Sequence, residues 1–326
     1  MTTRRTVVLA LGASALASPF VSAAQPARMA RIGFLGATSA KAYASRVEAL
    51  RAGLRDLGYV EGKNIVIEFR WADGKYERLP ELAAELVRLK VDVIVTHGTP
   101  GTFAAKKATT AIPIVMAISG DAVATGLVPS VARPGGNITG STFFNPELAA
   151  KRLELMREAV PSVKRISVLL NPANQVNGPT LKAMQATAAS LKLELQPVEV
   201  RGPEEFERAF SAIGAGRDDA LAVVEDAMLI SNARPLADLA ARNRLPSIGF
   251  LDFVEAGGLM AYGVNLVEVF RRAAVFVDKI LKGTRPADLP VERSTRFDFV
   301  INLKTAKMLG LTIPQLILLR ADRVIE

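Results

Sequence analysis

The residue types that carry out covalent or acid–base chemistry are scarce in this sequence. It contains no cysteine and a single histidine, His97. Disulfides, thiol nucleophiles, cysteine-ligated zinc and a lipid-anchoring cysteine are therefore excluded, and a catalytic triad has one available histidine. We interpret His97, which follows a predicted strand, as a pocket-wall residue rather than a general base. The sequence predicts no catalytic residue, no metal site and no cofactor, although chemistry based on aspartate or lysine alone stays open.

Small polar and acidic residues instead gather in loops that follow predicted strands. In open parallel α/β sheets, ligands bind beyond the carboxyl ends of the strands, where helix N-termini offer free N–H groups. We predict that a small polar solute is bound by side chains from these loops and their neighbours: Ser39, Thr99, Asp121, Thr142, Phe143, Asn171, Asp226 and Tyr262.

Each of these residues also has a purely structural interpretation. The serine, the first threonine and the asparagine are good helix N-caps, a role that can coexist with ligand binding. The two aspartates could also be caps, but we interpret them as counter-ions for an amino group. The two aromatic residues either flank the binding cleft or belong to the core.

Nucleotide-binding motifs are absent. The loop at residues 98–102 lacks the G-x-x-x-x-G-K-[ST] spacing of a phosphate-binding loop, and no G-x-G-x-x-G follows the first predicted strand. The loops are therefore suited to a small solute rather than to a nucleotide.

The elements that must position these loops alternate short apolar runs with amphipathic stretches, which is typical of parallel α/β sheets. The first series of predicted strands and helices lies at 31–36, 43–57, 64–70, 77–89, 91–96, 101–109 and 113–118. The second begins with RISVLL, which resembles the earlier RIGFLG, and lies at 165–170, 181–191, 194–200, 203–213 and 220–224. Because the offset is about 130 residues, close to one domain length, we predict two doubly wound, Rossmann-like lobes joined by a hinge.

The remaining segments complete this division. Residues 133–144, with three glycines, are interpreted as a flexible crossover or hinge. A strand is predicted at 257–264, a long helix at 266–282, and a strand near 296–302 followed by one or two helices. We assign residues 30–142 and about 264–290 to an N-terminal lobe, and residues 143–263 and about 291–326 to a C-terminal lobe.

The first 24 residues have the order of a secretory signal. Arg4 and Arg5 precede the apolar run 6–17, and small residues lead to Ala24. We expect cleavage after Ala24 by a Sec or twin-arginine route and a periplasmic protein without a lipid anchor, with a buried N-terminal helix as the alternative.

The formal charge of +9 does not form a basic surface in the sequence pattern. Lysines and arginines, Arg152 among them, are scattered along predicted helices, and we interpret them as solvated helix faces. A nucleic-acid surface would concentrate them, so no nucleic-acid partner is expected, and an anionic ligand or partner is the alternative.

Several longer segments resemble a known family. They are LGYVEGKNIVIEFRWADG (57–74), RLPELAAELVRLKVDVIVTHGTP (78–100), VARPGGNITG (131–140), FVEAGGLMAYG (253–263), RRAAVFVDKILKGTRPADLPVE (271–292) and FDFVINLKTAKMLGLTIP (297–314). They are similar to the substrate-binding proteins of ABC transporters, in the tryptophan/tyrosine-type group with the type I periplasmic-binding fold. The resemblance extends from about residue 30 to the C-terminus.

This resemblance implies a two-lobed clamshell with three interlobe crossovers and a ligand between the lobes. It implies a monomer that delivers a small molecule to an ABC permease in the inner membrane, with an amino acid, aromatic in some relatives, as the best candidate. Ser39 and Thr99 would hold the carboxylate, and Asp121 or Asp226 would meet the ammonium group. Some relatives carry a lipid-anchor cysteine that this chain lacks.

Other functions stay open at the level of sequence. A periplasmic sensor that presents its bound state to a membrane receptor would have the same sequence features. An enzyme of the same fold would need a general base or a metal site, neither of which is visible. A transcription regulator of this fold would need a helix-turn-helix where this chain has an export signal.

Overall fold

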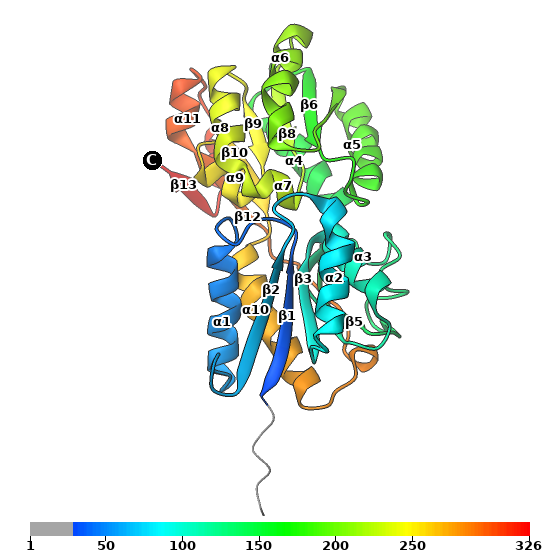
Figure 1. Ribbon diagram of the computed structural model, residues 1–326. Helices are drawn as coiled ribbons and strands as arrows, with labels where there is room; N and C mark the ends of the chain where they lie inside the picture. Colours follow the sequence, from blue (N-terminus) through cyan, green and yellow to red (C-terminus); the bar gives the residue numbers. More distant parts are fainter. Residues whose placement is uncertain (1–28) are drawn as a thin grey trace, which may run out of the picture.

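The computed structural model describes residues 29–326, and the predicted export signal lies outside these residues. The described chain forms two α/β lobes, one above the other in Figure 1, each built on one sheet. No helix between residues 29 and 326 combines the length and the apolar character that crossing a membrane requires.

The first lobe contains a six-stranded sheet in the order β11-β5-β4-β3-β1-β2, counted over the described residues. Its strands are β1 (Ala30–Gly36), β2 (Ile65–Trp71), β3 (Val93–His97), β4 (Ile114–Gly120), β5 (Ile138–Phe143) and β11 (Glu292–Arg293). Its helices are α1 (Ala44–Asp56), η1 (Tyr76–Arg78), α2 (Leu79–Arg88), α3 (Gly98–Ala108), α10 (Leu266–Leu281) and η3 (Pro286–Asp288).

The second lobe contains a seven-stranded sheet, again within the described chain, in the order β13-β12-β10-β9-β8-β6-β7. Its strands are β6 (Arg165–Leu170), β7 (Glu194–Glu199), β8 (Ala220–Val223), β9 (Ser247–Gly249), β10 (Met260–Gly263), β12 (Asp298–Asn302) and β13 (Arg323–Ile325). Its helices are α4 (Asn145–Ala159), α5 (Asn177–Leu191), η2 (Pro203–Glu205), α6 (Phe206–Gly216), α7 (Ala227–Ser231), α8 (Ala233–Arg242), α9 (Leu251–Glu255), α11 (Leu303–Met308) and α12 (Gln315–Leu318).

The predicted pair of doubly wound α/β lobes is confirmed. The five main strands of each lobe share one order, second-first-third-fourth-fifth, and pair in parallel. The exception to the predicted parallel pattern is β12, which runs antiparallel to β10. The chain passes between the sheets after β5, between β10 and α10, and between β11 and β12.

Alternation of side chains along β1 places a core on each face of the first sheet. Phe34 packs toward α1 and α10, whereas the next residue, Leu35, packs toward α2 and α3. Helices α1 and α10 approach closely at Gly53, where a Cβ atom would lie 2.5 Å from the carbonyl oxygen of Arg271. A larger residue at this position would push the two helices apart.

The prediction that residues 133–144 form a flexible crossover is wrong for its second half, because β5 occupies Ile138–Phe143. The glycine that suggested flexibility, Gly140, has φ +125° and lies so close to β4 that a Cβ atom would be 2.1 Å from the Met116 carbonyl oxygen. The polar residue Thr139 has its hydrogen-bond partner within the first lobe, since its hydroxyl donates to the Leu289 carbonyl at 2.8 Å. The chain crosses to the second lobe only after this strand.

The first strand of each lobe, β1 or β6, begins at or next to an arginine, and the contacts of this arginine are the same in both lobes. In the first lobe, the backbone N–H of Arg31 donates to Asp92 at 2.7 Å, and its guanidinium donates to the Leu89 carbonyl at 3.2 Å. Glu68 on the neighbouring β2 lies 4.0 Å from the same guanidinium. These contacts fasten the first strand to the segment before the third.

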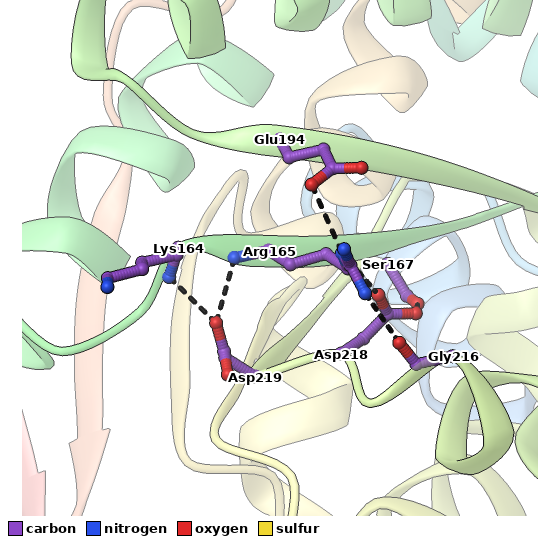
Figure 2. Close-up of polar contacts among 7 residues, drawn as sticks. All are labelled: Lys164, Arg165, Ser167, Glu194, Gly216, Asp218 and Asp219. Carbon is purple, nitrogen blue, oxygen red and sulfur yellow. Dashed lines mark hydrogen bonds and ion pairs between the residues drawn. The ribbon is translucent and has the colours of Figure 1, made fainter.

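Figure 2 shows the equivalent contacts at the start of β6 in the second lobe. The backbone N–H of Arg165 donates to Asp219 at 2.9 Å, and its guanidinium donates to the Gly216 carbonyl at 2.6 Å and to Glu194 at 3.2 Å. The repetition indicated by RIGFLG and RISVLL therefore extends from element order to individual side-chain contacts.

The two lobes differ beside this arginine. The second lobe has a buried polar pair in which Ser167 donates to Asp218 at 2.5 Å (Figure 2). The other carboxylate oxygen of Asp218 accepts no hydrogen bond and lies 3.7 Å from Arg165. At the corresponding positions the first lobe has Gly33 and Val91, which pack together without polar groups.

We expect Ser167→Ala to destabilise the protein by about 1–3 kcal/mol, because Asp218 would lose its hydroxyl donor while staying buried. The double variant Ser167→Ala/Asp218→Val restores an apolar pair and should be less destabilised than the sum of the two single variants. Urea unfolding of the four proteins measures this coupling. Additive losses would show that the two side chains do not act as a pair.

Candidate functional site

A pocket lies between the two lobes at the carboxyl ends of the parallel strands. Its empty volume is about 590 Å³, part of which is open to solvent. The first lobe contributes the ends of β3, β4 and β5 together with Tyr43, and the second contributes residues that follow β6, β8 and β9. Val264 and Leu266, at the crossover into α10, complete the wall.

On the first lobe, the pocket presents hydroxyl groups at the start of a helix. Thr99 and Ser119 are buried, and their Oγ atoms lie 3.3 Å apart. Thr99 is in the first turn of α3, which begins at Gly98. The first N–H groups of a helix have no partner within it and carry partial positive charge, so this end of the pocket can bind a carboxylate.

On the second lobe, the pocket presents the buried carboxylate of Asp226, which is the N-cap of α7. It accepts hydrogen bonds from the N–H groups of Met228 and Leu229 at 3.0 and 3.2 Å, and from Asn174 at 3.0 Å. Burial raises the pKa of Asp226, and these hydrogen bonds act in the opposite direction.

Two other carboxylates line the pocket, and each is paired with an arginine. Glu225 pairs with Arg152, and Asp252 pairs with Arg46. The hydrogen-bond partners of Asp226 within residues 29–326 are all uncharged donors. Glu225 and Asp252 are therefore paired with cations, whereas Asp226 is held by uncharged donors alone.

His97 is a wall of this pocket and is held in an aromatic stack. Its ring lies 4.1 Å from that of Tyr43, and the guanidinium of Arg46 covers the Tyr43 ring at 4.6 Å. Nε2 of His97 accepts the Ala37 N–H at 3.2 Å. Burial lowers the pKa of His97 from 6.5 to about 3, and the Arg46 charge acts in the same direction. A neutral ring whose acceptor nitrogen is already occupied is unsuited to general-base catalysis.

Two polar contacts join the lobes beside the pocket. The hydroxyl of Tyr76, on the first lobe, donates to Asp226 at 2.9 Å and accepts the Met228 N–H at 3.1 Å. Arg46 on α1 forms an ion pair with Asp252 on α9. The lobes thus contact each other through protein groups as well as through whatever occupies the pocket.

The structure brings three of the predicted ligand-binding residues together, since Thr99, Phe143 and Asp226 all line the pocket. Asn171 is buried and donates to Asp226 at 3.4 Å, but its side chain borders a separate interlobe groove. Ser39 borders the same groove, and its hydroxyl accepts the Ala42 N–H at 3.3 Å, as a cap would.

The other three predicted residues lie outside the pocket lining. Thr142 is buried and donates to the Ser119 carbonyl at 3.2 Å, so it supports the strand end next to the pocket. Asp121 accepts the Val123 and Ala124 N–H groups, which closes a turn. The Tyr262 ring packs against the rings of Phe297 and Phe299.

Sequence reasoning missed several lining residues. Glu225 directly precedes Asp226, and its role was not predicted. Phe250 and Asp252 lie in the stretch 227–255, where the sequence yielded no element assignment, whereas the structure has α7, α8, β9 and α9 there. The interpretation of Arg152 as part of a solvated helix face is wrong, because it is 1% exposed.

Across residues 29–326, no group of three or more histidine, aspartate or glutamate side chains is placed to hold an ion.

The chain matches the family of ABC transporter substrate binding proteins over residues 32–325. It belongs to this family. It is also similar to a tyrosine-binding protein of Clostridioides difficile strain R20291, with 29% identity over 259 residues that cover 79% of this chain and 74% of that protein. The sequence-based recognition of the family is confirmed.

Two solved structures show which arrangement of lobes this chain adopts. The ABC domain from Streptococcus pneumonia in complex with L-Trp is 27% identical, covers 91% of this chain and 99% of its own, and has a TM-score of 0.84. The ligand-free, open structure of a substrate-binding protein with adhesive properties from Clostridium difficile is 26% identical with the same coverage, but its TM-score is 0.64. This substrate-binding protein therefore resembles the ligand-bound arrangement more than the open one.

We expect Tyr76→Phe to weaken ligand affinity about three- to tenfold, because it removes a hydrogen bond that only the closed arrangement contains. The matched control is Tyr59→Phe. Tyr59 also donates to an aspartate, Asp278, at 3.0 Å, but both residues lie in the first lobe. Calorimetric titration of both variants compares them, and equal effects would show that the interlobe position of the bond is irrelevant.

We expect the stability of the protein to fall between pH 6.5 and about 3 because of His97. The unfolded chain binds a proton below its pKa of 6.5, whereas the folded ring does so only near pH 3. Protonation of this group alone therefore removes about 1.4 kcal/mol of stability for each pH unit by which the pH falls across that window. Above pH 6.5 the full stability contributed by the neutral His97 is present.

His97→Gln keeps an acceptor for the Ala37 N–H but cannot titrate. Urea unfolding at several pH values should show a shallower loss for this variant than for the parent. The raised pKa of Asp226 acts with the opposite sign, adding stability as the pH falls, and is present in both proteins. Parallel curves would contradict the assignment to His97.

Proposed function

We propose that this chain is the solute-binding component of an ABC importer and that it binds an amino acid with an aromatic side chain between its lobes. The observation that carries the proposal is the polarity of the pocket. Hydroxyl groups at a helix start lie on one lobe, carboxylates lie on the other, and apolar walls complete it.

The carboxylate of the amino acid would lie against Thr99 and Ser119. Their hydroxyls and the first N–H groups of α3 provide donors, and the partial positive charge of the helix start stabilises the negative group. The ammonium group would lie near Asp226. Its positive charge would offset the cost of burying that carboxylate, which the hydrogen bonds from uncharged donors offset only in part.

The side chain of the ligand would occupy the apolar part of the pocket. Phe143 and Phe250 line it from the two lobes, and Val264 and Leu266 line it from the crossover. Aromatic surfaces and branched aliphatic groups favour a large apolar side chain. The names of the tyrosine-binding relative and the L-Trp complex support the same class of ligand.

The chain would work as a monomer in the periplasm, after export and cleavage near Ala24, and would deliver its ligand to a permease in the inner membrane. The order of charged, apolar and small residues in the first 24 positions supports export. Closure of the two lobes around the ligand would create the surface that the permease recognises.

A binding screen tests the proposal. The purified chain, refolded to remove ligand carried from the cell, is titrated with tryptophan, tyrosine and phenylalanine, and with leucine, glutamate, lysine and sugars as comparisons. A rise in melting temperature that grows with the concentration of an aromatic amino acid is expected. A shift with sugars alone would overturn the amino-acid assignment.

Export is tested separately. N-terminal sequencing of the protein recovered from the periplasm should give Gln25 as the first residue.

Two aspartate variants locate the ammonium group. Asp226→Asn should weaken binding by about 2–5 kcal/mol, because a buried charge would lose its partner. Asp121→Asn, at a carboxylate outside the pocket, should change affinity by no more than about twofold. Isothermal titration gives both values, and equal losses would contradict an ammonium site at Asp226.

A further inference from the structure

Arg152 is a large side chain buried at the edge of the ligand pocket. It belongs to α4 and is 1% exposed. Its guanidinium makes five hydrogen bonds, to both carboxylate oxygens of Glu225, to the Val223 carbonyl at 3.2 Å, and twice to the Tyr262 carbonyl at 2.9 and 2.7 Å. Because arginine carries five N–H donors, its hydrogen-bonding capacity is fully used.

These contacts hold Glu225 at the pocket wall. The bidentate pairing fixes the plane of the carboxylate as well as its position. The Glu225 side chain is still 14% exposed and lines the pocket, so it can accept a further hydrogen bond from a ligand. A buried carboxylate without such a cation would be strongly disfavoured in its charged form.

The same arginine links α4 and β10, the two elements of the second lobe that lie next to two of the three crossovers. Helix α4 begins at Asn145, directly after the chain leaves β5. Tyr262 is the penultimate residue of β10, from which the chain returns to α10 in the first lobe. Gly263, the last residue of β10, lies beside the pair: a Cβ atom there would be in van der Waals contact with Arg152 at 3.4 Å and with Glu225 at 3.7 Å.

We propose that Arg152 is a positioning residue for ligand recognition: it aims the Glu225 carboxylate at the ammonium group of the bound amino acid. This inference rests on the proposed amino-acid ligand. It makes Glu225 a second partner of the ammonium group beside Asp226. It assigns part of the discrimination between an amino acid and the same molecule without its amine to Arg152, a side chain that does not touch the ligand.

The test compares two ligands in each variant. One is the aromatic amino acid that binds the parent, and the other is its desamino analogue, which keeps the carboxylate and the ring. The parent should prefer the amino acid by at least about 100-fold, because a site built to hydrogen-bond an amine leaves polar groups unpaired without it. Arg152→Lys keeps the charge but cannot span both carboxylate oxygens, so the preference should fall by about tenfold or more.

Glu225→Gln provides a second variant that keeps the size of the side chain and the carbonyl contacts of Arg152. It should lose the preference to a similar extent while binding the desamino analogue nearly as well as the parent. Arg234→Gln, which removes a charge from an exposed ion pair on α8, is the control and should leave both affinities unchanged. If Arg152→Lys does not fold, Glu225→Gln still tests the proposal, because an unchanged preference in this variant would overturn it.

A purely structural role would weaken both ligands equally and leave the preference unchanged, which would overturn the proposal. In that case the proposed function would survive, because the parent still binds the amino acid. If the parent binds no amino acid, the proposed function and this inference are both overturned.

Discussion

Carboxylates that are wholly or partly buried where the two lobes meet impose the constraint on which the rest of the site depends. A charged group removed from water must find a cation or several strong donors nearby. Glu225 finds Arg152 within its own lobe, whereas Asp252 finds Arg46 in the other lobe. Asp226 finds amides, N–H groups and the hydroxyl of Tyr76. The arrangement of α1, α4, η1 and α7 satisfies these needs together.

The sequence predicted the framework because the framework follows from periodic patterns. Regular spacing of apolar residues identified α1 and α10, and short β-rich runs identified β1, β3 and β6. The doubly wound topology places strand ends at one edge, so the order of strands and helices was enough to place Thr99 and Asp226 in the same cleft. Buried polarity was harder to predict. Strand β5 contains a glycine and hydroxyl residues that indicate a loop. The close approach to β4 explains the glycine, and the hydrogen bond to the Leu289 carbonyl explains Thr139.

Individual site residues were less predictable because exposure depends on packing between distant segments. Arg152 lies in a helix with other charged residues, and nothing in its local pattern distinguishes it from a solvated arginine. Its burial follows from the ends of β8 and β10, which are far away in the sequence. Phe250 and Asp252 were missed for a related reason, since the elements around them, β9 and α9, have only three and five residues and are too short to show a period. Ser39 was wrongly expected in the pocket for the opposite reason: it is a polar residue after a strand, but it borders the second interlobe groove.

The bond from Tyr76 to Asp226 joins the lobes without using any ligand atom. Each such bond raises the fraction of empty molecules that are closed, because it favours one state of the equilibrium whatever is bound. In the proposed role as the binding component of an importer, a closed but empty molecule would compete with a loaded one for the docking surface on the permease. A stronger bond would hold cargo longer and increase futile encounters, whereas a weaker one would release cargo before delivery. The strength of the hydrogen bond from the Tyr76 hydroxyl would thus set a balance between holding the ligand and releasing it.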